Sequence, residues 1–254
     1  MLLVLALAAG HSRAESGQPA REDGILVAAA ASLSALAPEL SRAFLDASGI
    51  HLRFNFAASN TLARQIVEGA RVDAFVSADV VQMDVVEKAG RVLPGSRVNV
   101  VSNQLVIVVS ATDASRSWPA GLSAPSIRRV AMGDPGAVPV GVYGRQWLER
   151  IGLWQQVAPK VVSLPTSPAA LAAVREGRAE AAIVYATDAR SPAAGSIRVA
   201  HVIPVSAAPP IVYPAAVIRG GREAEAQRFV AFLRDRAAQS IFEAAGFRPI
   251  DGAG

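Results

Sequence analysis

Hydroxyl residues in this sequence stand at places where an apolar run gives way to a helical pattern. Ser32 follows a run of small residues, Ser59 follows a strand-like run, and Ser167 lies directly before Pro168. A fourth turn, the segment GDPGAVPVG, leads into a helical pattern near Val140. The first backbone N–H groups of a helix have no partner within the helix, and they lie at the positive end of its dipole. Such turns therefore provide hydrogen-bond donors for an anion without any charged side chain.

Two other readings of these serines concern capping and catalysis. A residue at the start of a helix often accepts a hydrogen bond from the first turn, so we expect Ser32, and Ser59 or Asn60, to cap their own helices. A serine nucleophile would need a positioned base. The sequence has no G-x-S-x-G motif, and neither Lys88 nor Lys160 completes an S-x-x-K pattern. The residues therefore do not predict an enzyme.

The composition limits the chemistry further. With no cysteine and 3 histidines among 254 residues, disulfides and thiol chemistry are excluded and a metal site is disfavoured. Asp73 and Asp79 lie on a strand-like run and at its exit without metal-ligand spacing, so we expect them to be structural. The formal charge is +4, but the basic residues are scattered, so we expect no nucleic-acid partner.

The first residues predict export. MLLVLALAA, residues 1–9, is an apolar run too short to span a bilayer. Together with the following GHSRA it is typical of a secretory signal peptide that occupies residues 1–14. The alternative is a frayed N-terminal extension. Because the sequence has no cysteine to carry a lipid, we expect a soluble periplasmic protein that is not lipid-anchored.

Strand-like and helix-like segments alternate along the rest of the chain. Strands are predicted at 25–31, 50–59, 72–79, 103–110, 158–165, 179–188 and 210–218, with a short one within 126–139. Helices are predicted at 32–49, 59–70, 81–90, 140–154, 167–177 and 222–246, the last as one or two helices. This series predicts an α/β fold with mainly parallel sheet and helices on both faces.

Two stretches of the chain share one plan. RQIVEGARVDAFVSAD (64–79) and AAVREGRAEAAIVYATD (172–188) each run from a helix through Glu-Gly into an apolar strand with a polar exit that ends in Asp. The similarity suggests two related lobes that face each other. A cleft between such lobes is a common place for a ligand in open α/β architectures.

Six short sequence blocks, which occur in a fixed order along the chain, resemble those of a known family. They are AAASLSAL, FNFAASNTLARQIVEGARVDAFVSAD, NQLVIVV, MGDPGAVPVGVYGRQWLERIGLW, AAIVYATDA and FEAAGF, between Ile25 and Phe247. Together they resemble the periplasmic molybdate-binding proteins of ABC transporters. The resemblance implies the two-lobed type II periplasmic binding protein fold, in which each lobe is a mainly parallel sheet flanked by helices and the ligand cleft lies between the lobes.

The resemblance also implies how the chain is divided. Lobe 1 is expected to comprise 22–103 and 212–254, and lobe 2 to comprise 104–211. The chain is expected to cross between lobes near 104–109 and 211–214. The function that the resemblance implies is the capture of molybdate or tungstate and its delivery to a membrane permease. The protein is expected to be a monomer that needs no cofactor besides this ligand.

The resemblance implies a ligand set of five residues, which are Ser32, Ser59, Val140, Ser167 and Tyr185. The first two serines are expected to give a hydroxyl and a backbone N–H, Val140 and Ser167 a backbone N–H, and Tyr185 its hydroxyl. Molybdenum would be bound only as its oxyanion. The sequence departs from the family at Ser167, where an apolar residue is frequent, and at Ala58, where some members have serine.

This ligand set contains donors only, which favours a fully deprotonated tetrahedral dianion. Hydrogen phosphate would bring a proton that lacks an acceptor, which is costly in a buried site. Sulfate has no such proton and would have to be rejected by the size of the cavity. Two alternatives stay open at this point, a serine-dependent hydrolase on the same two-lobed scaffold and a binding protein for another oxyanion or a small organic anion.

Overall fold

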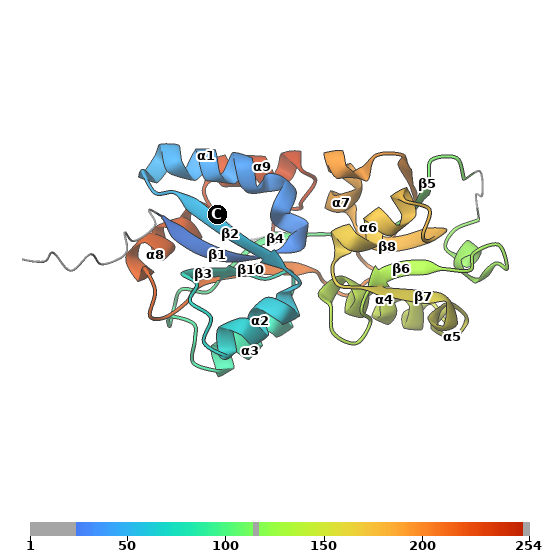
Figure 1. The fold of residues 1–254 in the computed structure, drawn as a ribbon, viewed down its shortest axis with the longest axis horizontal. Coiled ribbons are helices and arrows are strands. Elements are labelled where there is room, and N and C mark those ends of the chain that lie inside the picture. Colours follow the sequence, from blue (N-terminus) through green and yellow to red (C-terminus); the bar gives the residue numbers. More distant parts are fainter. Residues whose placement is uncertain (1–23, 114–116, 251–254) are drawn as a thin grey trace, which may run out of the picture.

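The computed structural model describes residues 24–113 and 117–250, which form two five-stranded sheets in the two halves of an elongated molecule (Figure 1). The first sheet contains β1 (Ile25–Ala30), β2 (Leu52–Ala57), β3 (Ala74–Val76), β4 (Val98–Ser102) and β10 (Val212–Val217). The second contains β5 (Leu105–Ser110), β6 (Val130–Gly133), β7 (Val161–Leu164), β8 (Ala181–Tyr185) and β9 (Ile197–Val202). The predicted signal peptide, residues 1–14, lies outside the described residues.

The two sheets share one topology. Their strand orders are β2-β1-β3-β10-β4 and β7-β6-β8-β5-β9. In the first, β1 pairs in parallel with β2 and β3, and β10 pairs antiparallel with β3 and β4. In the second, β6 pairs in parallel with β7 and β8, and β5 pairs antiparallel with β8 and β9. Each sheet therefore has four strands in one direction and one against them, which confirms the prediction of mainly parallel sheets.

Helices cover both faces of each sheet (Figure 1). The first half has α1 (Ala37–Ser48), α2 (Ser59–Val67), α3 (Val80–Lys88), α8 (Glu223–Phe232) and α9 (Arg236–Ala244), and the second has α4 (Pro139–Arg150), α5 (Trp154–Val157), α6 (Ser167–Arg175) and α7 (Ala186–Arg190). Short 3₁₀ turns are η1 (Ala31–Leu36), η2 (Ala120–Ser123), η3 (Ala158–Lys160) and η4 (Pro192–Ala194).

Side-chain alternation along the strands explains these two layers. Val27 and Ala29 of β1 belong to the hydrophobic cluster that contains Phe44 of α1. Ala28, between them, belongs to the cluster that contains Leu62 of α2. Successive side chains of a strand point to opposite faces, so a strand that is apolar throughout is buried under helices on both sides.

The chain passes between the sheets twice. It leaves β4 of the first sheet and enters β5 of the second over Asn103 and Gln104, and it returns from β9 to β10 over residues 203–211. The strands that follow the two passages are β5 and β10. Each of them runs antiparallel to the other four strands of its sheet. We call the first passage the 103–104 crossing and the second the 203–211 crossing.

Some predicted elements differ from the observed ones. Strands β4 and β9 were not predicted, and the predicted strand 103–110 begins only at Leu105. Both missed strands lie at sheet edges, where one face is partly exposed and the apolar pattern is broken. The predicted helix 32–49 is a 3₁₀ turn followed by α1, with Pro38 in the first turn of α1 and Gly49 at its C-cap. The segment 222–246 forms two helices.

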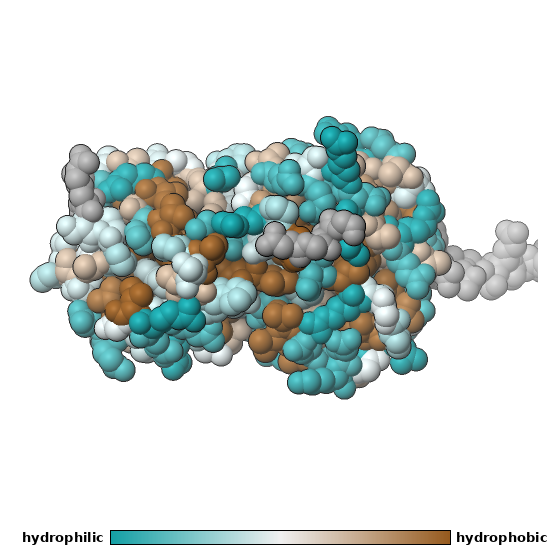
Figure 2. All heavy atoms as spheres, turned by 180° about the vertical axis from the view of Figure 1, so that it is seen from behind, coloured by the Kyte–Doolittle hydropathy of each residue, from teal (hydrophilic) through white to brown (hydrophobic). Residues whose placement is uncertain are grey.

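The surface is apolar in places. From behind, apolar side chains gather near the middle of the face, where the two halves meet, and hydrophilic side chains dominate the ends (Figure 2). Within residues 24–113 and 117–250, the helices are too short or too polar to cross a membrane.

Candidate anion-binding site

A small cavity of about 20 Å³ lies between the two halves of the molecule, and all five predicted ligand residues line it. Ser32 and Ser59 reach it from the first half, and Val140, Ser167 and Tyr185 reach it from the second. The rest of the lining is mostly alanine and other uncharged residues, and no charged side chain is part of it. The structure thus brings together residues that are up to 153 positions apart in the sequence.

Parallel strands explain this convergence. Ser32 and Ser59 follow the carboxyl ends of β1 and β2, which are neighbours in the first sheet. Val140 and Ser167 follow β6 and β7 in the same way, and Tyr185 is the last residue of β8. Parallel strands place their carboxyl ends at one edge of a sheet, and the helices that follow begin there. Both sheets present that edge to the cavity.

The hydroxyls of Ser32 and Ser59 are not helix caps. Ala30 and Ala58 occupy the N-cap positions of η1 and α2, and neither element has a side-chain cap. Ser32 Oγ instead lies 2.9 Å from the hydroxyl of Tyr213, and Ser59 Oγ accepts a hydrogen bond from the backbone N–H of Ala78 at 2.8 Å. The predicted capping role is therefore wrong. The alanine before each helical turn holds the N-cap position, so both serines lie within the first turn, and their hydroxyls contact residues of other segments instead.

Val140 lies in the first turn of α4, which packs directly onto the end of β6. A Cβ atom on Gly141 would overlap the carbonyl oxygens of Gly133 and Asp134. Only glycine allows this close approach of helix and strand. Val138 holds the N-cap position, and α4 has no side-chain cap. The tight packing therefore explains the V-P-x-G pattern and sets the backbone of Val140 against the cavity.

Ser167 is the first residue of α6, and Thr166 caps that helix by accepting a hydrogen bond from the N–H of Ala169 at 3.2 Å. The Ser167 hydroxyl donates to Asp188 Oδ2 at 2.5 Å and accepts from the N–H of Tyr185 at 3.2 Å. Its hydrogen is already used within the protein. Ser167 is thus left with its backbone N–H as the group to offer a ligand.

Tyr185 is buried, and its hydroxyl has no hydrogen-bond partner among the described residues. Its ring contacts that of Tyr213 edge to face, with centroids 5.9 Å apart. Burial raises the pKa of Tyr185 well above its usual range, so its hydroxyl stays protonated at neutral pH. Buried polar atoms in folded proteins are nearly always paired, so an unpaired hydroxyl that lines a cavity calls for an explanation, and a ligand would provide one.

Three residues near the site were missed by sequence reasoning. Tyr213 and Asn103 are buried beside the two crossings, and their side chains are hydrogen-bonded to each other at 3.2 Å. Asp188 is buried behind Ser167. A signal was present in each case, since each is a polar residue within or directly after an apolar strand-like run. Nothing local to those runs identifies their partners.

The acidic residues that were predicted to be structural have structural partners. Asp73 accepts from the backbone N–H of Leu26 at 2.6 Å and of Arg222 at 2.7 Å, so it ties β1 to the segment before α8. Asp79 caps α3 by accepting from the N–H of Gln82 at 2.9 Å. In the described part of the chain, no group of three or more histidine, aspartate or glutamate side chains is placed to hold a metal ion.

Comparison with known proteins agrees with this geometry. The family model described as "Bacterial extracellular solute-binding protein" matches residues 25–248. The molybdate-binding protein ModA of Escherichia coli K12 is 32% identical over 94% of this chain and 92% of its own length. ModA of Mycobacterium tuberculosis H37Rv is 34% identical over 97% and 94%, respectively. The structure of the periplasmic molybdate-binding protein of Azotobacter vinelandii matches with a TM-score of 0.80 at 24% identity, over 89% of this chain and 100% of that one.

These matches run over nearly the whole chain, and the solved structure places its fold among the type II periplasmic binding proteins. The family consists of solute-binding proteins and not of enzymes, which removes the hydrolase alternative. The chain belongs to the bacterial extracellular solute-binding proteins and, within them, to the ModA family.

Proposed function

We propose that this protein captures molybdate, or tungstate, between its two lobes and delivers the anion to the membrane permease of an ABC transporter. The observation that carries the proposal is the buried Tyr185 hydroxyl, which lines the cavity and lacks a partner among the described residues. A buried hydroxyl without a partner costs about 1–3 kcal/mol. An oxyanion that accepts its hydrogen bond would remove this cost. The names of the E. coli and M. tuberculosis relatives support the same ligand.

The proposed ligand set favours an oxyanion without a proton. The hydroxyls of Ser32, Ser59 and Tyr185 and the N–H groups of Val140 and Ser167 all donate, and no carboxylate lines the cavity. Hydrogen phosphate would bring a proton without an acceptor. Sulfate brings no proton, so its rejection rests on cavity size. Molybdate and tungstate are nearly equal in size, so both are proposed ligands.

The proposed site requires two lobes that can separate and close. We propose that lobe 1 comprises 22–103 and 212–254 and that lobe 2 comprises 104–211. The strand topology supports this division, since β5 lies in the second sheet and β10 in the first. The 103–104 and 203–211 crossings are then the two hinge segments.

The proposed location is the periplasm. We propose that residues 1–14 are removed as a signal peptide and that the mature protein is a monomer without a lipid anchor or a nucleic-acid partner. Support comes from the apolar start of the sequence, the lack of cysteine and the extracellular character of the family.

Titration of the purified protein with a series of oxyanions tests the proposed function. We expect molybdate and tungstate to raise the melting temperature, because a ligand that binds only the folded state stabilises it by mass action. Sulfate and phosphate should do so only weakly. Equal shifts with sulfate and molybdate at the same concentration would contradict the proposed selectivity.

In an isothermal calorimetric titration, Tyr185→Phe should weaken molybdate binding by about tenfold to a hundredfold, because it removes one hydrogen bond to a charged ligand. Arg64→Ala is the control. Arg64 is exposed in the last turn of α2 and does not line the cavity, so the change should cost at most a few-fold. Abolished binding in Arg64→Ala with unchanged binding in Tyr185→Phe would rule out a site of neutral donors.

A further inference from the structure

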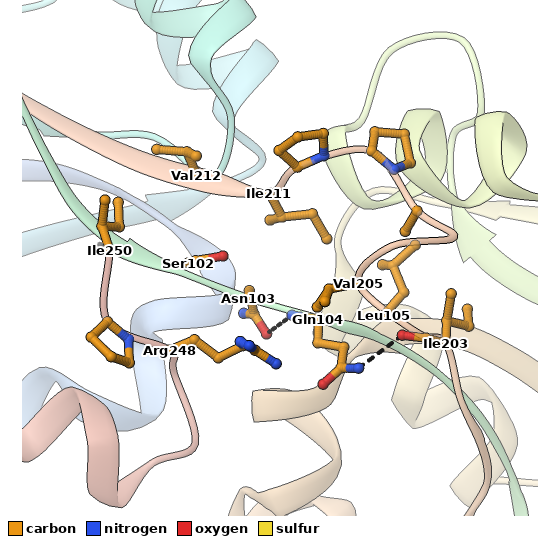
Figure 3. A pocket seen from close by; sticks show the side chains of 14 residues that line it. Ser102, Asn103, Gln104, Leu105, Ile203, Val205, Ile211, Val212, Arg248 and Ile250 are labelled. Carbon is orange, nitrogen blue, oxygen red and sulfur yellow. Dashed lines mark hydrogen bonds between the residues drawn. The ribbon is translucent and has the colours of Figure 1, made fainter. Parts of the chain in front are cut away.

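A chain of hydrogen bonds connects the 103–104 crossing to the cavity. The backbone N–H of Gln104 donates to Asn103 Oδ1 at 2.8 Å, a bond drawn in Figure 3. Asn103 Nδ2 lies 3.2 Å from the hydroxyl oxygen of Tyr213 and 3.0 Å from that of Thr187. The Tyr213 hydroxyl lies 2.9 Å from Ser32 Oγ. All these side chains except that of Gln104 are buried.

The bond from Gln104 fixes the orientation of Asn103 and favours one direction for the bonds that follow it. A backbone N–H can only donate, so the oxygen of the Asn103 carboxamide must face Gln104 and its NH₂ group must face Tyr213. An NH₂ group also only donates, so the Tyr213 oxygen accepts there. The hydrogen of Tyr213 is then available for Ser32 Oγ, 2.9 Å away, and in this arrangement the serine oxygen accepts it. The remaining hydrogen, that of Ser32, is free to point into the cavity.

We propose that Asn103 and Tyr213 are positioning residues that occupy one lone pair of Ser32 and direct its hydrogen towards the bound oxyanion. The inference rests on the proposed function and extends it, because it assigns part of the selectivity to residues that do not line the cavity. A serine hydroxyl can otherwise rotate and accept the proton of a hydrogen phosphate. When Ser32 accepts from Tyr213 and its hydrogen points at the ligand, the serine is a poorer acceptor for that proton, and a weakened or lost hydrogen bond is costly in a buried site.

We call the series of hydrogen bonds from Gln104 through Asn103 and Tyr213 to Ser32 the relay. Two further observations agree with it. Burial raises the pKa of Tyr213 far above its usual range, so the phenol keeps the hydrogen that the relay needs. Ser59 is set in the same way, since its oxygen accepts the N–H of Ala78 and its hydrogen is left for the cavity. Both serine hydroxyls are therefore fixed by donors anchored in the backbone, one directly and one through two side chains.

The relay also passes through the hinge. Figure 3 shows Asn103 and Gln104 on the segment that joins the two halves, beside the 203–211 crossing. Tyr213 lies on β10 just after that second crossing, and Thr187, the other partner of Asn103, lies on α7 of the second half. The direction of the Ser32 hydroxyl thus depends on residues at both crossings.

Asn103→Asp tests the relay with almost no change of shape. The new carboxylate cannot donate to Tyr213 and instead accepts its hydrogen, so Tyr213 would accept from Ser32 and the relay would reverse. We compare sulfate with hydrogen phosphate near pH 8, where both are dianions of similar size and differ by one proton. The ratio of sulfate affinity to phosphate affinity should fall by about tenfold or more relative to the wild type.

The ratio separates the relay from simple charge repulsion, because a new negative charge weakens both dianions alike. If Asn103→Asp weakens both by the same factor, the relay is wrong. Thr187→Val is the matched control, since it removes the other partner of Asn103 and leaves the path to Ser32 intact; it should leave the ratio unchanged. Tyr213→Phe should lower the ratio as Asn103→Asp does, without adding charge.

Neutron crystallography of the deuterated wild-type protein tests the relay without any ligand. We expect the deuterium of Tyr213 to point at Ser32 Oγ and that of Ser32 to point away from Tyr213. A deuterium on Ser32 directed at Tyr213 would overturn the relay. Failure of the wild type to bind any oxyanion would contradict the proposed function instead, and the neutron map would still decide the relay.

Discussion

The direction of each hydroxyl distinguishes the three site serines, although their sequence positions are similar. Ser59 accepts a backbone N–H and keeps its hydrogen for the cavity. The Ser167 hydroxyl donates its hydrogen to Asp188. A serine hydroxyl can donate to an anion only when its hydrogen is not already donated to another acceptor. The buried carboxylate behind Ser167 therefore has a role in setting which group Ser167 can offer.

Asp188 should make stability depend on pH. Burial raises the pKa of this carboxyl to about 7, against the opposing hydrogen bond from Ser167. Its usual pKa of 3.8 applies in the unfolded chain, so the folded protein binds more protons between about pH 4 and pH 7. The contribution of Asp188 to the free energy of unfolding is therefore highest below that window and falls as pH rises through it, by up to about 1.4 kcal/mol per pH unit.

Urea unfolding of the wild type and of Asp188→Asn, measured from pH 4 to pH 8, checks this expectation. The variant should lose the decline in stability that Asp188 causes and should be the more stable of the two at pH 8. Asp46→Asn, on the exposed face of α1, is the control and should keep the wild-type slope. An unchanged slope in Asp188→Asn would mean that this carboxyl does not titrate in the window.

At the scale of elements, the site is an arrangement of helix starts at the carboxyl ends of parallel strands. The turns η1, α2 and α4 carry no side-chain cap, and their first residues line the cavity. Uncapped N–H groups at the positive end of a helix are suited to an anion. The absence of charged side chains from the lining is consistent with neutral donors as the source of attraction.

Gly141→Ala should disturb the site through the backbone of α4. The added Cβ would overlap the carbonyl oxygens of Gly133 and Asp134, so the helix start must move away from β6. We expect the free energy of unfolding to drop by about 1–3 kcal/mol, as for other overpacked positions, and molybdate affinity to fall with it. Gly136→Ala, in the same loop, meets only the Asp134 side chain at 3.3 Å and should change both quantities little. Wild-type affinity in Gly141→Ala would contradict the proposed role of this backbone.

At the scale of the whole molecule, the two halves are joined by two crossings and by hydrogen bonds between side chains beside them. Asn103 of the first crossing contacts Thr187 of the second half and Tyr213 of the first. Each half supplies only part of the proposed ligand set, so neither half can surround an anion alone. A ligand that contacts both halves has a higher affinity for the closed form and shifts the population towards it.

Small-angle scattering should detect this closure. We expect the radius of gyration to be smaller with saturating molybdate than without it, because Ser32 and Ser59 on one side are then bridged to Val140 and Tyr185 on the other. Sulfate at the same concentration is the control and should leave the radius close to that of the free protein. Equal radii with and without molybdate would contradict ligand-driven closure.

Local patterns in the sequence were enough to predict the elements that surround the site. Strand 25–31 was predicted from a continuous apolar run, and the helix that begins near Ser59 from a cap residue ahead of a helical pattern. The five cavity residues were found through a resemblance to one family, and all five line one cavity. The edge strands β4 and β9 were missed, since an edge strand is half exposed and has no continuous apolar run.

The hydrogen-bond partners could not be predicted in this way. Ser32 contacts Tyr213, 181 residues further along the chain, and Ser167 contacts Asp188 on another element. Such pairs form only when distant segments of the chain pack together, and the residues next to each serine in the sequence do not indicate its partner. The types of residue at the site thus follow from the amino-acid sequence, whereas the direction of each hydroxyl, and with it the group offered to a ligand, depends on contacts between distant segments.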